Sequence, residues 1–502
     1  MLASGPGGPD LSLGIWTISI LGGAARRIRD NAWLATPSPD GSLIAFISPD
    51  YREIWVMKAS GEEAHKIASM ESSATFSQVA WAPDGQRLAY LKSYSLESRN
   101  VIESCDLRGQ DVRLIWSDSR LKNFCWTRRG QIIGALTDAG IGGGPAHSDL
   151  WEVHVGSRGA PGQPSRLTDF AGFTALSLSA TADGNHLALI RNYDQSDVYV
   201  GELDAVAAHL AAPRRLTLDD RIDWPGGWTR DSNAVLFYSD RQGSLDLFRQ
   251  KLDGRAAELM LSSPEEKRQP QLTPDGSSIV YLEWPKGVNG ATPSSGRVMR
   301  VPLAGGPPQL ILQVSGYPGS AQTPRGDNMR VLTTNGHPDL RCSRTAGGSC
   351  VVTEGDSNRV TFYRFDPIRA GKNEISSVDA HGSSFWDLSG DGSKIAFGDV
   401  GRGDHVRILP VNGGAPRDVP VNGVRVIASI GWAADGESLF LTGTAPEGGS
   451  ILRHVLMDGQ SQLLYKSDAW LERPLASPDG AHLAFGLASS SNNVWTVENL
   501  KE

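Results

Sequence analysis

The pattern of apolar runs separated by a polar turn is clearest at residues 34–48, with the sequence LATPSPDGSLIAFIS. Two short apolar runs flank the tripeptide Pro39-Asp40-Gly41. Proline presets φ at the first corner of a turn, aspartate bonds its own backbone, and glycine accepts a positive φ. Every position from 43 to 47 is apolar, so both faces of the second run are apolar. The segment predicts a tight hairpin buried on both sides, as in an inner strand pair between neighbouring sheets.

The Asp-Gly turn of this hairpin recurs along the chain. Its aspartates are Asp40, Asp84, Asp183, Asp275, Asp391, Asp435 and Asp479. The intervals 40 to 84, 391 to 435 and 435 to 479 are each 44 residues. The longer intervals hold altered copies at residues 125–130, at residues 227–232 and around Cys342 and Cys350. A fixed period of this size, repeated about ten times, indicates a solenoid, a propeller or an array.

Each unit continues beyond its hairpin with two more short apolar runs. In the first full unit they are residues 53–57 and 65–67. Four antiparallel strands per repeat are typical of a propeller blade, and helical spacing is confined to residues 203–210. The sequence therefore predicts an all-β protein, a β-propeller built of about ten four-stranded antiparallel blades.

Ten blades exceed the four to eight usual for one ring, which favours two propellers. Residues 156–164 are rich in glycine and proline and are predicted to join them. Residues 1–164 would form a partial N-terminal propeller of about three and a half blades, and residues 165–502 a seven-bladed C-terminal one. The last unit ends at its third strand, so we expect Ser165–Thr168 to supply the closing strand. In the alternative, Ala25–Arg29 closes a single ring of ten.

The Ser-Pro-Asp-Gly hairpin, followed by a strand such as Ile54-Trp55-Val56, resembles the TolB-like propeller repeat. Longer segments resemble the C-terminal propeller regions of bacterial signalling proteins; they are residues 14–18, 148–153, 196–203 and 493–499. In that family the propeller follows a winged-helix DNA-binding domain or a Ser/Thr kinase domain. The resemblance implies a TolB-like fold and a sensor-like role, with room for such an upstream domain in a parent chain. It does not define a ligand.

Composition narrows the range of partners. The net charge is −8 and the isoelectric point about 5.7, which argues against a nucleic-acid surface. No apolar run approaches the roughly 18 to 20 residues of a membrane span. The first 16 residues lack the basic start followed by an apolar stretch that is typical of a signal peptide. We expect a cytoplasmic location if the chain is complete and a periplasmic one if it follows a membrane anchor.

Four cysteines are present, Cys105, Cys125, Cys342 and Cys350. The last two flank a glycine-containing loop and could come within disulfide distance. The interpretation favoured from sequence is that both are small buried thiols in a strand pair. No cysteine or histidine pair has metal-ligand spacing, so neither a metal nor a cofactor is expected.

The loops that enter the innermost strands should meet at one mouth of the C-terminal ring. Several of them combine aromatic, arginine and carboxylate side chains, which suit a protein partner or a small polar ligand. The candidate binding residues are Asp223, Trp224, Arg268, His381, Trp386, Trp470 and Arg473. The alternative is an ordinary solvated loop rim.

No catalytic residues are predicted. A Gly-x-Ser-x-Gly nucleophile elbow is missing from the sequence, and no α/β segment follows the repeats. We therefore expect a non-catalytic sensor, ligand-binding or protein-interaction module rather than an enzyme. One alternative is a hydrolase or lyase that uses carboxylates and His381 at the same mouth. Another is a scaffold without a small ligand.

Overall fold

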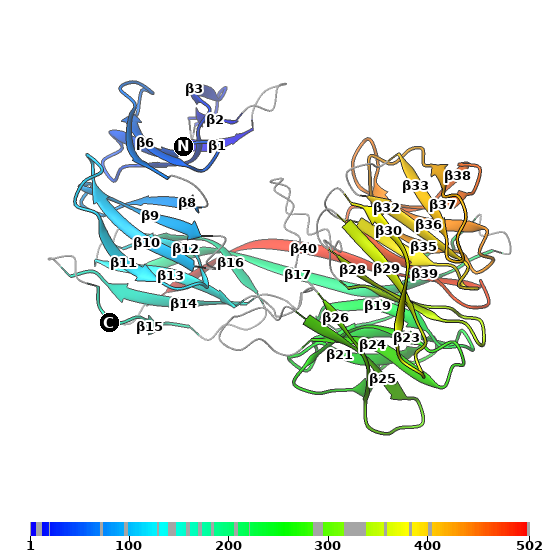
Figure 1. Cartoon of the computed structure of the whole chain (residues 1–502). Helices are drawn as coiled ribbons and strands as arrows, with labels where there is room; N and C mark the ends of the chain where they lie inside the picture. The colour runs from blue at the N-terminus through cyan, green and yellow to red at the C-terminus, as the bar shows by residue number, and fades with distance from the viewer. Residues whose placement is uncertain are drawn as a thin grey trace. The chain divides into compact units, whose positions relative to one another are not determined.

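The computed structural model describes residues 2–6, 13–19, 21–70, 74–94, 99–127, 130–138, 147–156, 161–168, 173–181, 185–204, 209–219, 221–284, 295–315, 338–355, 359–380, 384–399 and 404–498. The regular elements of these residues are β-strands, which form ten antiparallel sheets, most of them four-stranded (Figure 1). This confirms the predicted all-β fold of about ten four-stranded blades. None of the described residues form a helix that is long and apolar enough to cross a membrane.

The chain divides into two compact units. Unit 1 comprises residues 1–139, 146–193 and 491–502, and unit 2 comprises residues 140–145 and 194–490. Two strands of 17 residues, β17 (His186–Glu202) and β40 (His482–Glu498), each contribute to both units. They pair with each other, as Figure 1 shows. The chain therefore enters unit 2 along β17 and leaves it along β40.

Unit 1 contains three complete four-stranded blades and two smaller sheets. Its strands are β1 (Leu2–Pro6), β2 (Leu13–Thr17), β3 (Arg26–Asp30), β4 (Trp33–Pro37), β5 (Leu43–Ile47), β6 (Glu53–Lys58), β7 (His65–Ser69), β8 (Ala74–Trp81), β9 (Arg87–Tyr94), β10 (Arg99–Asp106), β11 (Arg113–Ser117), β12 (Leu121–Trp126), β13 (Gln131–Asp138), β14 (His147–His154), β15 (Ser165–Arg166) and β16 (Thr174–Ala180), with the first part of β17 and the last part of β40. Contacts between sheets follow the order β1, β4, β8, β12, β16. In the described part of the chain, no comparable contact joins β16 back to β1.

Unit 2 is a closed ring. Its strands are β18 (Arg214–Arg215), β19 (Asp223–Trp228), β20 (Ala234–Ser239), β21 (Asp246–Lys251), β22 (Glu258–Leu261), β23 (Glu266–Leu272), β24 (Ser278–Trp284), β25 (Ser295–Pro302), β26 (Gln309–Ser315), β27 (Leu340–Cys342), β28 (Cys350–Gly355), β29 (Arg359–Phe365), β30 (Lys372–Asp379), β31 (Ser384–Leu388), β32 (Lys394–Asp399), β33 (His405–Pro410), β34 (Arg417–Pro420), β35 (Val426–Trp432), β36 (Ser438–Thr444), β37 (Ser450–Leu456), β38 (Ser461–Ser467) and β39 (Trp470–Ala476), with the remaining parts of β17 and β40. The innermost strands contact one another in the cyclic order β19, β23, β27, β31, β35, β39 and back to β19. The described residues thus build six blades around one axis.

The sixth blade is assembled from two distant parts of the chain. Its order is β39, β40, β17, β18, so β17 and β18 supply the two outer strands. The expected closing strand, Ser165–Thr168, is placed differently. Ser165–Arg166 is β15, which pairs with β14 of its own blade. The alternative closing segment around β3 pairs with β2, so it does not close a ring of ten either.

The division of the chain differs from the predicted boundary between residues 164 and 165. Residues 173–193 belong to unit 1, and the repeat around Asp183 contributes to both units. Residues 191–195 contain neither glycine nor proline, so nothing there interrupts a strand. β17 therefore continues as one long strand from unit 1 into unit 2. This leaves six blades in unit 2 where the repeat count predicts seven.

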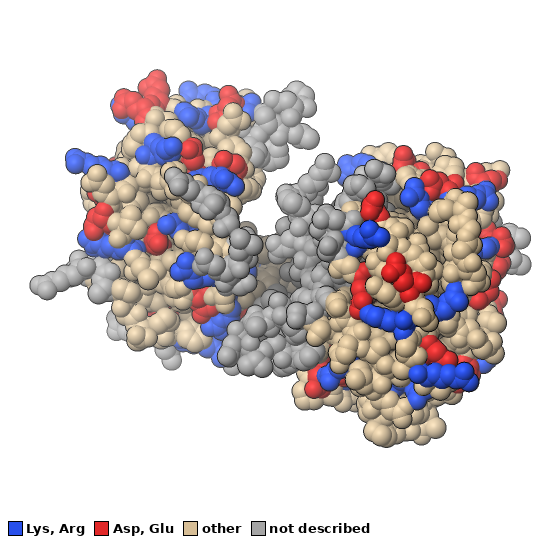
Figure 2. Space-filling view, in the orientation of Figure 1, with Lys and Arg blue, Asp and Glu red and all other residues tan. Residues whose placement is uncertain are grey.

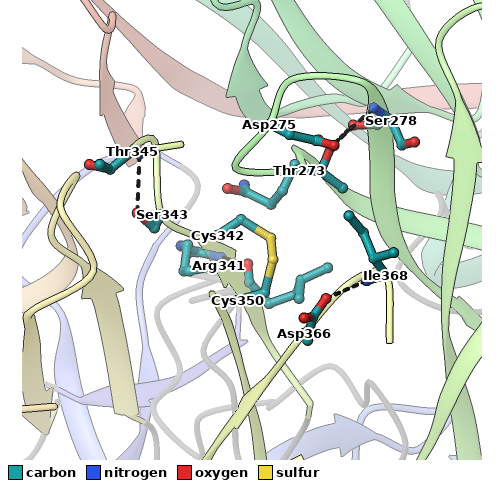
Figure 3. The surroundings of a disulfide bond; sticks show 12 residues. Thr273, Asp275, Ser278, Arg341, Cys342, Ser343, Thr345, Cys350, Asp366 and Ile368 are labelled. Carbon is teal, nitrogen blue, oxygen red and sulfur yellow. Dashed lines mark hydrogen bonds between the residues drawn. A yellow bond between two sulfur atoms is a disulfide. The ribbon is translucent and has the colours of Figure 1, made fainter. Parts of the chain in front are cut away.

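The two cysteines of unit 2, Cys342 and Cys350, are bonded to each other. Cys342 and Cys350 lie directly opposite in the β27–β28 pair, with their Cα atoms 4.0 Å apart, and form a disulfide (Figure 3). The expectation of two buried thiols is therefore wrong for this pair, because the strand register places the side chains on the same face. Cys105 and Cys125 are buried free thiols. Burial raises the pKa of Cys125 to about 12.

Candidate functional site

The innermost strands of unit 2 enclose a cavity near their N-terminal ends. We call this cavity the mouth cavity. It measures about 40 Å³. Its described lining residues are Asp339, Arg341, Ser384, Phe385, Trp386, Ala428, Ser429, Ile430, Trp470, Glu472, Arg473 and Leu475. They come from β27, β31, β35 and β39 and the residues just before them. Three of the predicted binding residues, Trp386, Trp470 and Arg473, are therefore brought together.

Arg473 is the central cation of the mouth cavity. It lies in a bulge of β39 between Glu472 and Leu475 and has a φ of 51°. Its backbone N–H donates a hydrogen bond to Ser429 Oγ at 2.8 Å, which helps to hold this uncommon conformation. The bulge reorients the side chain, so that its guanidinium lies 5.8 Å from the centre of the Tyr238 ring.

The Arg473 guanidinium has no ion pair with a described residue, and its buried Nε has no acceptor there. Burial lowers the pKa of Arg473, but the phenol of Tyr238 and the carboxylates of Asp339 and Glu472 outweigh this effect and raise the pKa above its ordinary value. The mouth cavity therefore contains a cation whose charge is stabilised from a distance but whose hydrogen-bond donors are incompletely used.

Two tryptophans lie beside this cation. Trp386 is almost fully buried and packs edge-on against Phe362, with ring centres 5.3 Å apart. Its indole N–H has no hydrogen-bond acceptor among the described residues. Trp470 is only partly buried. Both tryptophans line the cavity; Trp386 is packed into its wall and Trp470 is the more exposed of the two.

Asp223 and Trp224 occupy structural positions at the start of β19. Asp223 is fully buried, and its Oδ1 accepts from Arg241 Nη2 at 2.8 Å. Burial raises the pKa of Asp223, although the Arg241 charge opposes it. Trp224 packs on Tyr238, with ring centres 5.3 Å apart. Because both side chains are held within the first blade, neither lines the mouth cavity.

Arg268 and His381 complete the predicted set. Arg268 lies on β23 and forms an ion pair with Glu266, with a nitrogen–oxygen distance of 3.6 Å. Burial raises the pKa of Tyr238, and the positive charge of Arg268 partly opposes this rise. It is not among the described lining residues of the mouth cavity. His381 lies outside the residues that the structure describes.

Sequence reasoning missed three charged lining residues. Arg341 on β27 bridges two acids, with Nη1 2.7 Å from Asp339 Oδ1 and Nε 3.0 Å from Asp387 Oδ1. Glu472 is buried and accepts from Ser196 Oγ at 3.3 Å. Burial raises the pKa of Glu472, with Arg473 opposing. The unusual composition of the repeat that precedes Cys342 was the only sequence signal for Asp339 and Arg341.

Metal binding is not indicated by the described residues, which contain no group of three or more His, Cys, Asp or Glu side chains that could hold an ion. Lys and Arg are interspersed with Asp and Glu on the face shown in Figure 2.

No family model matches the sequence, and no curated protein sequence matches it. Solved structures of β-propellers are similar to the chain. TolB from Acinetobacter baumannii is 14% identical with a TM-score of 0.23, over 70% of this chain and 63% of that chain. The β-propeller domain of the Trilobed protease from Pyrococcus furiosus is 17% identical with a TM-score of 0.28, over 60% and 88%. An oligogalacturonate lyase in complex with manganese is 10% identical with a TM-score of 0.31, over 76% and 85%.

At these identities the similarity concerns the fold alone. The chain spans about 63% of the length of the Acinetobacter TolB chain. It is an all-β protein of propeller blades whose structural neighbours include TolB and other propeller proteins.

Proposed function

We propose that the chain is a non-catalytic binding module and that the mouth cavity of unit 2 receives an acidic group of a small polar ligand or of a protein partner. The observation that carries this proposal is the Arg473 guanidinium, which lacks an ion-pair partner in the described structure. A carboxylate accepts charge-assisted hydrogen bonds from a guanidinium and from an indole N–H. Both Arg473 and Trp386 line this cavity.

The size of the mouth cavity limits what enters it. A volume of about 40 Å³ suits one functional group, since pockets that take a whole drug-sized ligand measure roughly 300 to 1,000 Å³. The rest of the ligand would lie outside, against the partly buried Trp470. A carboxylate at the end or on a side chain of a peptide meets both conditions, and so does a small organic acid.

The biological setting that we propose is a bacterial signalling system in which the propeller is the sensor. This rests on the repeat segments that resemble C-terminal propeller regions behind kinase or winged-helix domains. A parent chain would carry such an upstream domain, and this region itself would bind no nucleic acid. The net charge of −8 is consistent with that division of roles.

The test is a thermal-shift and calorimetric screen of the chain against acidic metabolites and short acidic peptides. A specific ligand of the folded state raises the melting temperature. Arg473→Gln should weaken binding by about tenfold or more, as loss of a charged hydrogen bond does, while Arg473→Lys should retain part of it. Arg369→Gln, on an exposed turn of unit 2, is the matched control and should bind normally.

Two results would count against this proposal. One is a ligand that binds equally well to Arg473→Gln. The other is catalytic turnover in a glycosidase and peptidase substrate screen that disappears in His381→Ala, because it would establish the hydrolase or lyase alternative.

A further inference from the structure

Unit 2 contains a second cavity near the C-terminal ends of its innermost strands. It measures about 80 Å³ and is bordered by the ends of β19, β23, β27, β31 and β39. Three arginines line it, Arg230, Arg341 and Arg344, against one aspartate, Asp387, among its described lining residues. We call it the arginine cavity. This excess of positive charge contrasts with the overall net charge of −8.

The carboxylate of Asp387 is already engaged. Its Oδ1 is 3.0 Å from Arg341 Nε, and its Oδ2 accepts from the backbone N–H of Trp432 at 2.8 Å. Arg341 also binds Asp339. Arg341 and its two acids therefore form a satisfied group that adds little unused binding capacity.

Arg344 is different, because its side chain forms no ion pair and no hydrogen bond with any described residue. It lines the arginine cavity and is partly buried. Burial lowers the pKa of Arg344, and the charge of Asp387 opposes this only in part. Partial burial of a guanidinium without a close counterion carries a desolvation cost. A bound anion would offset that cost.

The turn that carries Arg344 is held firmly. The backbone N–H of Arg344 donates to Gly390 O at 2.7 Å, and Ser343 Oγ donates to the same carbonyl at 3.1 Å. The Cys342–Cys350 disulfide ties the base of this turn, beside Arg341, as Figure 3 shows. A binding group on a preorganised turn loses little conformational entropy when a ligand arrives.

Arg230 approaches the cavity from another blade. Its Nη1 donates to the carbonyl of Asp275 at 3.1 Å, which fixes the side chain across the neighbouring turn. A guanidinium has five N–H donors, so most of those on Arg230 remain available. The cavity thus combines one anchored arginine and one without a partner, on turns of different blades.

We propose that the arginine cavity binds a small oxyanion, the phosphate or carboxylate group of a small molecule, through Arg230 and Arg344. Arginine presents paired N–H donors that match the oxygens of both groups. A volume of about 80 Å³ is well below the roughly 300 to 1,000 Å³ of pockets that take a whole drug-sized ligand, so it suits one such group rather than a whole nucleotide. Arg341 and Leu475 line both cavities, but neither Arg230 nor Arg344 lines the mouth cavity.

Isothermal titration of the full chain with inorganic phosphate, and separately with acetate, tests the proposal at constant ionic strength set with sodium chloride. We expect saturable binding of at least one oxyanion at millimolar concentration. The affinity should fall by about tenfold or more in Arg344→Gln. Arg230→Gln should weaken it as well, whereas Arg369→Gln should leave it unchanged. Each variant is also titrated in an Arg473→Gln background, so that carboxylate binding at the mouth cavity does not contribute. Tighter binding of phosphate or of acetate identifies the preferred group.

The proposal is overturned if neither oxyanion binds up to about 20 mM, or if Arg344→Gln binds as tightly as the unaltered chain. It is also overturned if sodium chloride alone reproduces the heat of binding. Circular dichroism and the unfolding midpoint establish that each variant is folded. If Arg344→Gln does not fold, Arg230→Gln decides, because Arg230 is exposed and normal oxyanion binding by that variant would refute the site.

Discussion

At the scale of single residues, the Asp-Gly turn explains why the repeat is visible in the sequence. The described glycines of these turns have φ between 70° and 76°; they are Gly41, Gly85, Gly276, Gly392, Gly436 and Gly480. Gly184, of the same pattern, lies outside the described residues. The preceding aspartate accepts hydrogen bonds from its own turn. In the first hairpin the hydroxyls of Ser38 and Ser42 help to lower the pKa of Asp40 to about 2.

Gly436 isolates the backbone contribution of this turn. Its φ is 70°, and an added Cβ would meet no atom within 4 Å. Gly436→Val should therefore lower the free energy of unfolding by about 1 to 3 kcal/mol through backbone strain alone. Gly436→Asn should cost less, because asparagine tolerates this region of φ. Urea denaturation measures both, and an unchanged midpoint for the valine variant would contradict the role assigned to the turn.

At the scale of elements, the β27–β28 hairpin shows how a covalent bond replaces the missing Asp-Gly turn. The two cysteines are 8 residues apart in sequence. Closing a loop of this length stabilises the fold by about 2 to 3 kcal/mol in the chain-entropy model. Cys342→Ser/Cys350→Ser should lower the unfolding midpoint accordingly, whereas adding a reductant to that variant should have no further effect. Equal stability of the variant and the oxidised chain would show that the bond does not support the hairpin.

The elements also show which features the sequence could predict. Strands and turns within a repeat follow from local patterning, and the hairpin around Asp40 is correctly predicted. Register between strands is not local, so the sequence allowed the pairing of Cys342 with Cys350 but did not favour it. Arg473 was a candidate because of its loop, but its orientation depends on a β-bulge. Asp339 and Arg341 belong to an altered repeat whose pattern gave little warning of their positions.

At the scale of the whole molecule, closure of the six-bladed ring depends on the pairing of β17 with β40. The two strands are more than 270 residues apart in the sequence. No periodicity within a repeat can report such a contact, which explains why the closing strand was predicted elsewhere. Val198 and Val200 of β17 are buried in the same core cluster as Trp228 and Phe237. They fill the space between the closing blade and the first blade of the ring.

This arrangement predicts which fragment of the chain is self-sufficient. Residues 194–490 include all six blades, and the fragment should unfold in one cooperative transition. Residues 204–490 lack β17 and so lose Val198 and Val200, each worth about 1.5 to 3 kcal/mol when buried. That fragment should be less stable by at least about 3 kcal/mol and should expose the edge of β40 to association. Chemical denaturation and analytical ultracentrifugation compare the two. Equal stability and a monomeric shorter fragment would mean that β17 is not the strand that closes the ring.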